Sequence, residues 1–162
     1  MMKKFLFLLS AVVLFTTTSC LIGDDSNSNS GKSTGRLTVF NEDGTISYDD
    51  DNASITIAIP NYAEPKLDVV FNGVKFADAM PVQVNIKFAG IPFTYTVSED
   101  QSTSNYIFDV TNLVPTISGT PREEYTASRF WGCVGRDVDI RFIIPYRGKE
   151  VHFTNAKKEN KE

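Results

Sequence analysis

The chain has 162 residues, of which 41% are hydrophobic and 22% charged, a composition typical of an ordinary globular protein. Acidic residues outnumber basic ones, which gives a formal net charge of −4 and argues against nucleic acid as a partner and against adhesion to anionic lipid headgroups. Two cysteines and one histidine leave little material for a disulfide framework or a histidine-rich metal site.

The first 19 residues have the pattern of a cleaved export signal. Lys3 and Lys4 precede an apolar run over residues 5–15 that only Ser10 interrupts, and residues 16–19 are small and polar. A helix that spans a bilayer needs about 20 apolar residues, so this run is too short for one and fits a signal peptide. We therefore predict that residues 1–19 are removed.

Cys20 follows the signal peptide directly. The stretch Thr17-Thr18-Ser19-Cys20 resembles a lipobox, the sequence at which bacterial signal peptidase cuts before a diacylated cysteine, although Thr17 stands where the commonest pattern has leucine. The resemblance implies that Cys20 carries lipid. We therefore expect a lipoprotein of the outer membrane, anchored at the periplasmic or the cell-surface side of that membrane. Two or more acyl chains give stable anchoring. Cleavage without lipidation is the alternative.

Residues 20–35 are expected to form a flexible linker, because Ser, Asn, Gly and Asp dominate them. Asp24 and Asp25 resemble an acidic export signal of surface lipoproteins, and solvated linker carboxylates are the other interpretation. Removal of residues 1–19 leaves 143 residues with 14 basic and 20 acidic side chains, a formal charge of −6. The lipid alone is therefore expected to hold the protein to the membrane.

Residues 36–156 are predicted to form one antiparallel β domain, because apolar residues recur there at every second position. A turn at 42–45, which contains Asp43-Gly44, is expected to join strands near 36–41 and 45–48. A second turn is expected at 49–52. The alternating runs, whose apolar residues are expected to face inward, are residues 55–59, 67–71, 82–88, 93–97, 106–110 and 138–144, with a last strand at 150–154.

These runs give about nine or ten short strands, closed as a barrel or split into a two-sheet β-sandwich. Short stretches rich in proline and glycine, at 72–76, 80–82, 90–93 and 114–116, resemble the calycin-like bacterial lipoproteins of unknown function. The late run 132–153 is similar to them too. The resemblance implies a lipocalin-like barrel after a lipidated cysteine and linker, and it brings no functional residues. Residues 157–162 form a polar tail.

Catalytic chemistry is not indicated by any motif. His152, the only histidine, falls in the last predicted strand, where a solvent-facing position is expected rather than a catalytic role. Cys133 is expected to be a buried, unreactive thiol. Asp49, Asp50, Asp51 and Asn52 lack the spacing of a calcium-binding loop and are expected to be solvated. We predict no catalytic residue, metal or cofactor, and no enzyme.

Binding has better support, since 19 of the 162 residues are aromatic. Trp131, Tyr62, Tyr125 and Tyr146 are the candidates for stacking on a small hydrophobic molecule or a glycan, with packing in the core or at its rim as the other use. Two functions remain open at this stage. One is a binding module, and the other is a structural or interaction protein of an envelope complex, whose partners the sequence does not identify.

Overall fold

The computed structural model describes residues 29–61, 63–99 and 103–155, so the predicted signal peptide, Cys20, Tyr62 and the tail at 157–162 lie outside the described residues. The described chain is all-β and antiparallel, as predicted, with eleven strands rather than nine or ten. None of its helices is long and apolar enough to cross a membrane. The strands are β1 (Asn29–Asn41), β2 (Ile46–Ile59), β3 (Lys66–Val74), β4 (Val84–Pro92), β5 (Thr94–Val97), β6 (Ser104–Leu113), β7 (Thr116–Ile117), β8 (Thr120–Pro121), β9 (Ala127–Val134), β10 (Val138–Ile144) and β11 (Lys149–Thr154), with short 3₁₀ helices η1 (Glu123–Tyr125) and η2 (Pro145–Arg147).

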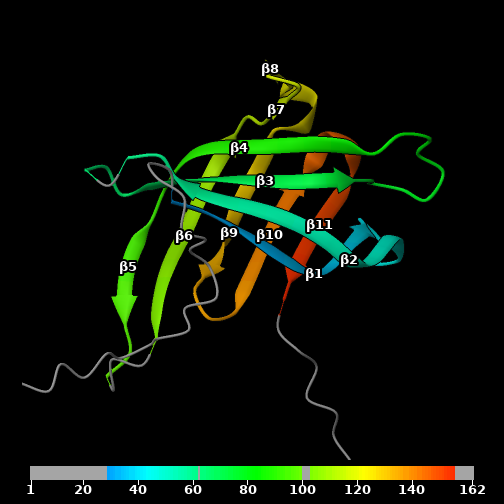
Figure 1. Ribbon diagram of the computed structural model, residues 1–162. Helices are drawn as coiled ribbons and strands as arrows, with labels where there is room; N and C mark the ends of the chain where they lie inside the picture. The colour runs from blue at the N-terminus through cyan, green and yellow to red at the C-terminus, as the bar shows by residue number, and fades with distance from the viewer. Residues whose placement is uncertain (1–28, 62, 100–102, 156–162) are drawn as a thin grey trace, which may run out of the picture.

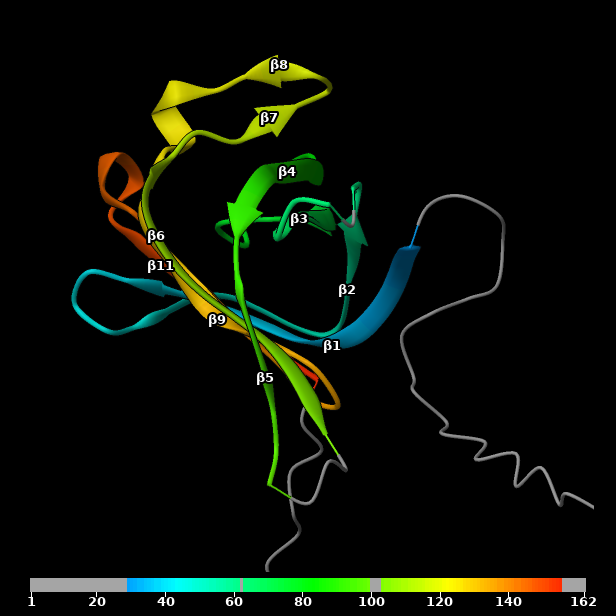
Figure 2. The same cartoon turned by 90° about the vertical axis from the view of Figure 1, so that its left-hand side faces the viewer.

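All eleven strands belong to one sheet, in the order β5-β6-β9-β10-β11-β1-β2-β3-β4-β7-β8, rather than to the two sheets of a sandwich. The sheet curls on itself, so that β3 and β4 run across β6, β9 and β10 (Figures 1 and 2). Residues 84–97, which contain β4 and β5, pair with residues 104–117, which contain β6 and β7, near both of their ends. The same two stretches of chain therefore bring the ends of the strand order together, which makes the sheet barrel-like.

Aromatic rings fill the interior. Phe71, Phe88, Phe130, Phe142 and Phe153 are fully buried, and neighbouring rings among them have centroids 4.7 to 6.3 Å apart. They come from five different strands and point inward because each strand sends alternate side chains to one face. Burial of such large apolar side chains is the main source of stability in a domain of this size.

The first strand begins earlier than predicted. Residues 29–35, predicted to belong to the linker at 20–35, instead pair with 53–59 of β2, and the rest of the predicted linker lies outside the described residues. The turn predicted at 49–52 is also wrong, since these residues continue β2. Their carboxylates are accommodated on the strand because Arg36 and Thr38 of β1 bind Asp49, with Arg36 Nε 2.9 Å from Asp49 Oδ1.

Two alternating runs do not lie where the pattern placed them. Val82 precedes β4 and is 63% exposed. Tyr95 and Val97, predicted to face the core together with Phe93, are 54% and 47% exposed. They lie on β5, which projects with the end of β6 beyond the rest of the sheet (Figure 2). The predicted turn at 42–45 is confirmed, with the Asn41 amide donating to the Thr45 carbonyl over 2.8 Å.

Candidate functional site

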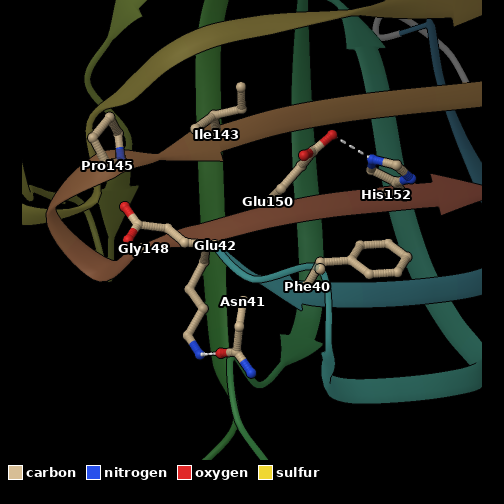
Figure 3. Close-up of a pocket in the computed structure, with 10 residues that line it drawn as sticks. Phe40, Asn41, Glu42, Ile143, Pro145, Gly148, Glu150 and His152 are labelled. Atoms are coloured by element: carbon tan, nitrogen blue, oxygen red, sulfur yellow. Dashed lines mark hydrogen bonds and ion pairs between the residues drawn. The ribbon is translucent and has the colours of Figure 1, made fainter.

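A hollow with a volume of about 480 Å³ lies on the outer surface of the barrel rather than inside it. It lies where β1, β10 and β11 meet, beside the turn that joins β1 to β2 (Figure 3). We call it the outer pocket. Its lining consists of Phe40, Asn41, Glu42, Gly44, Ile143, Pro145, Gly148, Lys149, Glu150 and His152.

Strand register brings the key side chains of the outer pocket together. Phe40 of β1 lies opposite Glu150 of β11, which in turn lies opposite Ile143 of β10. Because residues directly opposite each other share a face, these three side chains form a row across the outside of the sheet. The buried Val151 and Phe153 alternate with Glu150 and His152 along β11, so the inner face is apolar and the outer face carries the polar groups.

Phe40, His152 and Glu150 form a contiguous set at the pocket wall. The rings of Phe40 and His152 have centroids 4.9 Å apart and are tilted by 59°. His152 Nε2 lies 2.7 Å from Glu150 Oε1. An ionised carboxylate can only accept hydrogen bonds, so the Nε2–H group donates this hydrogen bond to Glu150, and Nδ1 is the second polar atom of the ring. His152 is partly exposed, in agreement with the solvent-facing position predicted for it.

Lys149 ties the floor of the outer pocket to the β1–β2 hairpin. Its Nζ donates to Asn41 Oδ1 and, over 2.8 Å, to Ser47 Oγ. Asn41 Nδ2 in turn donates to Thr45 Oγ1 over 2.9 Å. These bonds connect the ends of two strands that are distant in the sequence, so the pocket floor is held by β11 and the turn together.

The turn beside the pocket keeps a negative charge. The Thr45 hydroxyl donates to Asp43 Oδ1 over 2.6 Å, and the Thr45 amide donates to the same oxygen over 3.0 Å. These hydrogen bonds hold the pKa of Asp43 below its ordinary value, and the positive charge of Lys149 acts in the same direction. Together with Glu42 and Glu150, Asp43 makes this part of the surface rich in hydrogen-bond acceptors.

The outer pocket thus offers a phenyl ring, apolar side chains from Ile143 and Pro145, and carboxylate and amide groups within one concavity. A ligand with an apolar face and several hydroxyl groups matches such a surface. In the described part of the chain, no group of three or more His, Cys, Asp or Glu side chains could hold a metal ion.

The aromatic residues predicted to bind a ligand are not gathered in this pocket. Trp131 lies on β9, where the Arg129 guanidinium carbon is 4.7 Å from the Trp131 ring centroid and Arg129 also pairs with Asp109 over 2.7 Å. Tyr125 stacks on Phe76 with centroids 5.5 Å apart, beside a smaller hollow of about 240 Å³. Tyr62 and the side chain of Tyr146 lie outside the described residues.

Cys133 is partly exposed rather than buried, because it lies on the outer face of β9, opposite Ile107 of β6 and Asp139 of β10. Phe40 was not among the predicted ligand-binding residues. The available signal was its position on the polar side of an alternating run, after the inward Leu37 and Val39, immediately before a turn.

Comparison of this chain with known protein families, with curated proteins and with solved structures found no match.

Proposed function

We propose that this chain is a lipid-anchored protein of the bacterial envelope whose non-enzymatic β domain binds a glycan at the outer pocket. The observation that carries the proposal is the Phe40 ring, packed against the His152–Glu150 pair in an open concavity. The apolar face of a sugar ring would stack on Phe40, and its hydroxyl groups would bond to the carboxylate of Glu150 and to Nδ1 of His152.

A ligand inside the barrel has less support than one on its surface. The rings of Phe71, Phe88 and Phe142 meet at the centre of the interior, with centroids 5.0 to 6.2 Å apart. Such an interior would have to open before it could accept a small hydrophobic molecule. A structural role within an envelope complex remains the second candidate, and the binding test below separates it from the first.

The lipid anchor at Cys20 would keep the domain close to the membrane. Eight residues, 21–28, separate Cys20 from the start of β1. A flexible chain of that length has an r.m.s. reach of roughly 14–17 Å. The outer pocket would therefore meet its glycan within a short distance of the lipid headgroups.

The glycan proposal can be tested by NMR on the unlipidated mature chain, residues 21–162, because His152 gives the only imidazole signal. A panel of soluble oligosaccharides, including peptidoglycan and lipopolysaccharide core fragments, is titrated into labelled protein. We expect at least one of them to shift the His152 signal. Phe40→Ala should weaken that binding about tenfold, the loss expected for one aromatic stacking contact.

Trp131→Ala is the matched control, since it removes a partly exposed outer aromatic ring at another place on the sheet. It should leave the affinity unchanged. If no sugar moves the His152 signal, or if Trp131→Ala rather than Phe40→Ala abolishes binding, the outer pocket is not a glycan site and the structural role is favoured.

Lipidation is tested separately by metabolic labelling of the full chain with a palmitate analogue. The label should be present on the wild type and on Cys133→Ser and absent from Cys20→Ser. A wild-type chain without label would contradict the lipid anchor while leaving the glycan proposal intact.

A further inference from the structure

β5 forms one end of the sheet and has a free edge. It is the first strand in the sheet order and pairs only with β6. Because β3 begins at Lys66, opposite Pro92, no described strand lies beside residues 94–97 on the other side. In Figure 1, β5 accordingly lies at the outer left of the sheet.

The backbone groups on this free edge can be identified from two hydrogen bonds. Phe93 N–H donates to the Pro65 carbonyl, away from β6, whereas Ser98 N–H donates to the Thr103 carbonyl across the β5–β6 hairpin. Successive residues of a strand direct their backbone groups to opposite sides. The N–H and C=O groups of Tyr95 and Val97 therefore point outward from the edge of the sheet.

The side chains along this edge offer no protection against pairing. Residues 93–98 read Phe-Thr-Tyr-Thr-Val-Ser, without charge or proline and with residues that favour strands. Two other free edges are guarded: β8 consists of two residues and contains Pro121, and the part of β1 that precedes its pairing with β11 carries the exposed Lys32. An unguarded edge is a site for strand addition.

We propose that the occupant of this edge is β5 of a second copy of the chain, in antiparallel pairing about a twofold axis through Thr96. In that register Tyr95 lies opposite Val97 of the other copy, and each such pair exchanges two backbone hydrogen bonds. Four hydrogen bonds result from the outward groups identified above. The pairing extends the sheet continuously from one molecule into the next.

Charge and side-chain contacts favour a second copy over an unrelated strand. A twofold axis places the same segment of both copies side by side. Residues 93–98 carry no charge, so this arrangement brings no like charges together, although the chain as a whole has a formal net charge of −4. Glu99, the first described acid after this segment, would lie opposite Phe93 rather than opposite its own copy. Tyr95 and Val97, which are 54% and 47% exposed in one molecule, would form aromatic–aliphatic pairs across the axis.

Thr96 provides a direct test, because it would face its own copy at a pair without mutual hydrogen bonds. The Cα atoms of such a pair are about 4.5 Å apart, within the range that a disulfide spans. The full chain is expressed with its own leader, with Cys133→Ser and Thr96→Cys together, and the cells are treated with a mild oxidant. We expect a disulfide-linked homodimer on a non-reducing gel, identified by mass.

Thr111→Cys in the same Cys133→Ser background is the matched control, since Thr111 is an exposed residue of β6 outside the stretch that pairs with β5. It should remain monomeric. A second variant, Val97→Pro, is combined with Thr96→Cys, because proline removes an outward N–H without removing a β5–β6 hydrogen bond. The cross-linked fraction should fall at least about tenfold in this double variant. Val97→Ala keeps the N–H and should lower the cross-linked fraction less.

The proposal is overturned if Thr96→Cys stays monomeric while its thiol reacts with a maleimide. It is also overturned if Thr96→Cys cross-links to the same extent with Val97→Pro as with Val97 intact. A cross-linked species with the mass of this chain plus a different protein would also overturn it and would assign the edge to that partner. Unchanged Trp131 fluorescence and thermal melting in Val97→Pro would show that the domain is folded, so that loss of cross-linking reports on the edge.

Discussion

Replacement of Phe142 by alanine tests whether the barrel interior is packed as described. Phe142 is fully buried, and its ring centroid lies 5.0, 5.1 and 5.7 Å from those of Phe88, Phe71 and Phe130. A Phe→Ala change in a core costs about 3–5 kcal/mol of unfolding free energy, and the upper part of that range applies when rigid neighbours cannot collapse into the space. We expect about 4–5 kcal/mol here, because three of those neighbours are aromatic rings.

The assay is equilibrium unfolding in urea, followed by the fluorescence of Trp131, the only tryptophan. With a typical urea dependence of about 2 kcal/mol per molar, the midpoint should fall by about 2 M. Phe142→Leu, which keeps most of the volume, should cost about 1–2 kcal/mol. Val82→Ala, at a position that is 63% exposed, should stay within about 0.5 kcal/mol of the wild type.

Benzene provides an independent check on the same cavity, since an apolar cavity of this kind stays dry and binds small apolar molecules. Saturating benzene should restore part of the stability of Phe142→Ala and should leave the wild type unaffected. A loss below about 1 kcal/mol in Phe142→Ala would refute the packed interior, because it would mean that the Phe142 side chain stays partly exposed to solvent in the folded protein. A barrel with room for a hydrophobic ligand would then replace the outer pocket as the better explanation.

Two further predictions concern the backbone and the turn. Gly132→Ala should destabilise the domain by about 3 kcal/mol or more in thermal melts, because the added Cβ would stand 2.1 Å from the Asp139 carbonyl oxygen. Gly119→Ala, at a position with φ +77° but open space around it, should cost only about 1–2 kcal/mol. Equal losses in the two variants would contradict the clash at Gly132. Asp43 has a folded-state pKa below its unfolded value of about 3.9, so its carboxylate stabilises the fold above that value and loses the effect as the pH falls through the folded pKa. Asp43→Asn, which suits the same turn, should therefore be less stable than the wild type at pH 7 and should lose less stability than the wild type between pH 5 and pH 2 in urea unfolding; parallel losses would contradict this linkage.

Alternation in the sequence was sufficient where a strand has neighbours on both sides. Val138, Ile140, Phe142 and Ile144 of β10 were predicted to face inward and are fully buried, since β9 and β11 flank β10. The same pattern failed at Tyr95 and Val97. Period two predicts the side of the strand on which a residue lies, but it carries no information about whether another element covers that side.

The turn predicted from the acidic run in β2 was wrong for a related reason. Three consecutive aspartates predicted a turn because exposed carboxylates are common there, yet the neighbouring β1 supplies Arg36 and Thr38 to the first of them. The outer pocket was out of reach as well. Phe40 and Glu150 are 110 positions apart, and only the register of β1 against β11 places them opposite each other.

The position of the outer pocket relative to β5 links the two proposals. The pocket belongs to β10, β11 and β1 in the middle of the strand order, whereas β5 is the first strand of that order. In Figure 1, the β1–β2 turn that borders the pocket and β5 lie on opposite sides of the molecule. Pairing through β5 would therefore leave both pockets open. A twofold dimer would present two pockets in fixed relation, and a repetitive glycan could occupy both. Because the second binding event is then intramolecular, avidity can exceed the affinity of a single shallow pocket without any additional contact. Val97→Pro should consequently weaken binding to a long glycan and leave binding to its short fragments unchanged.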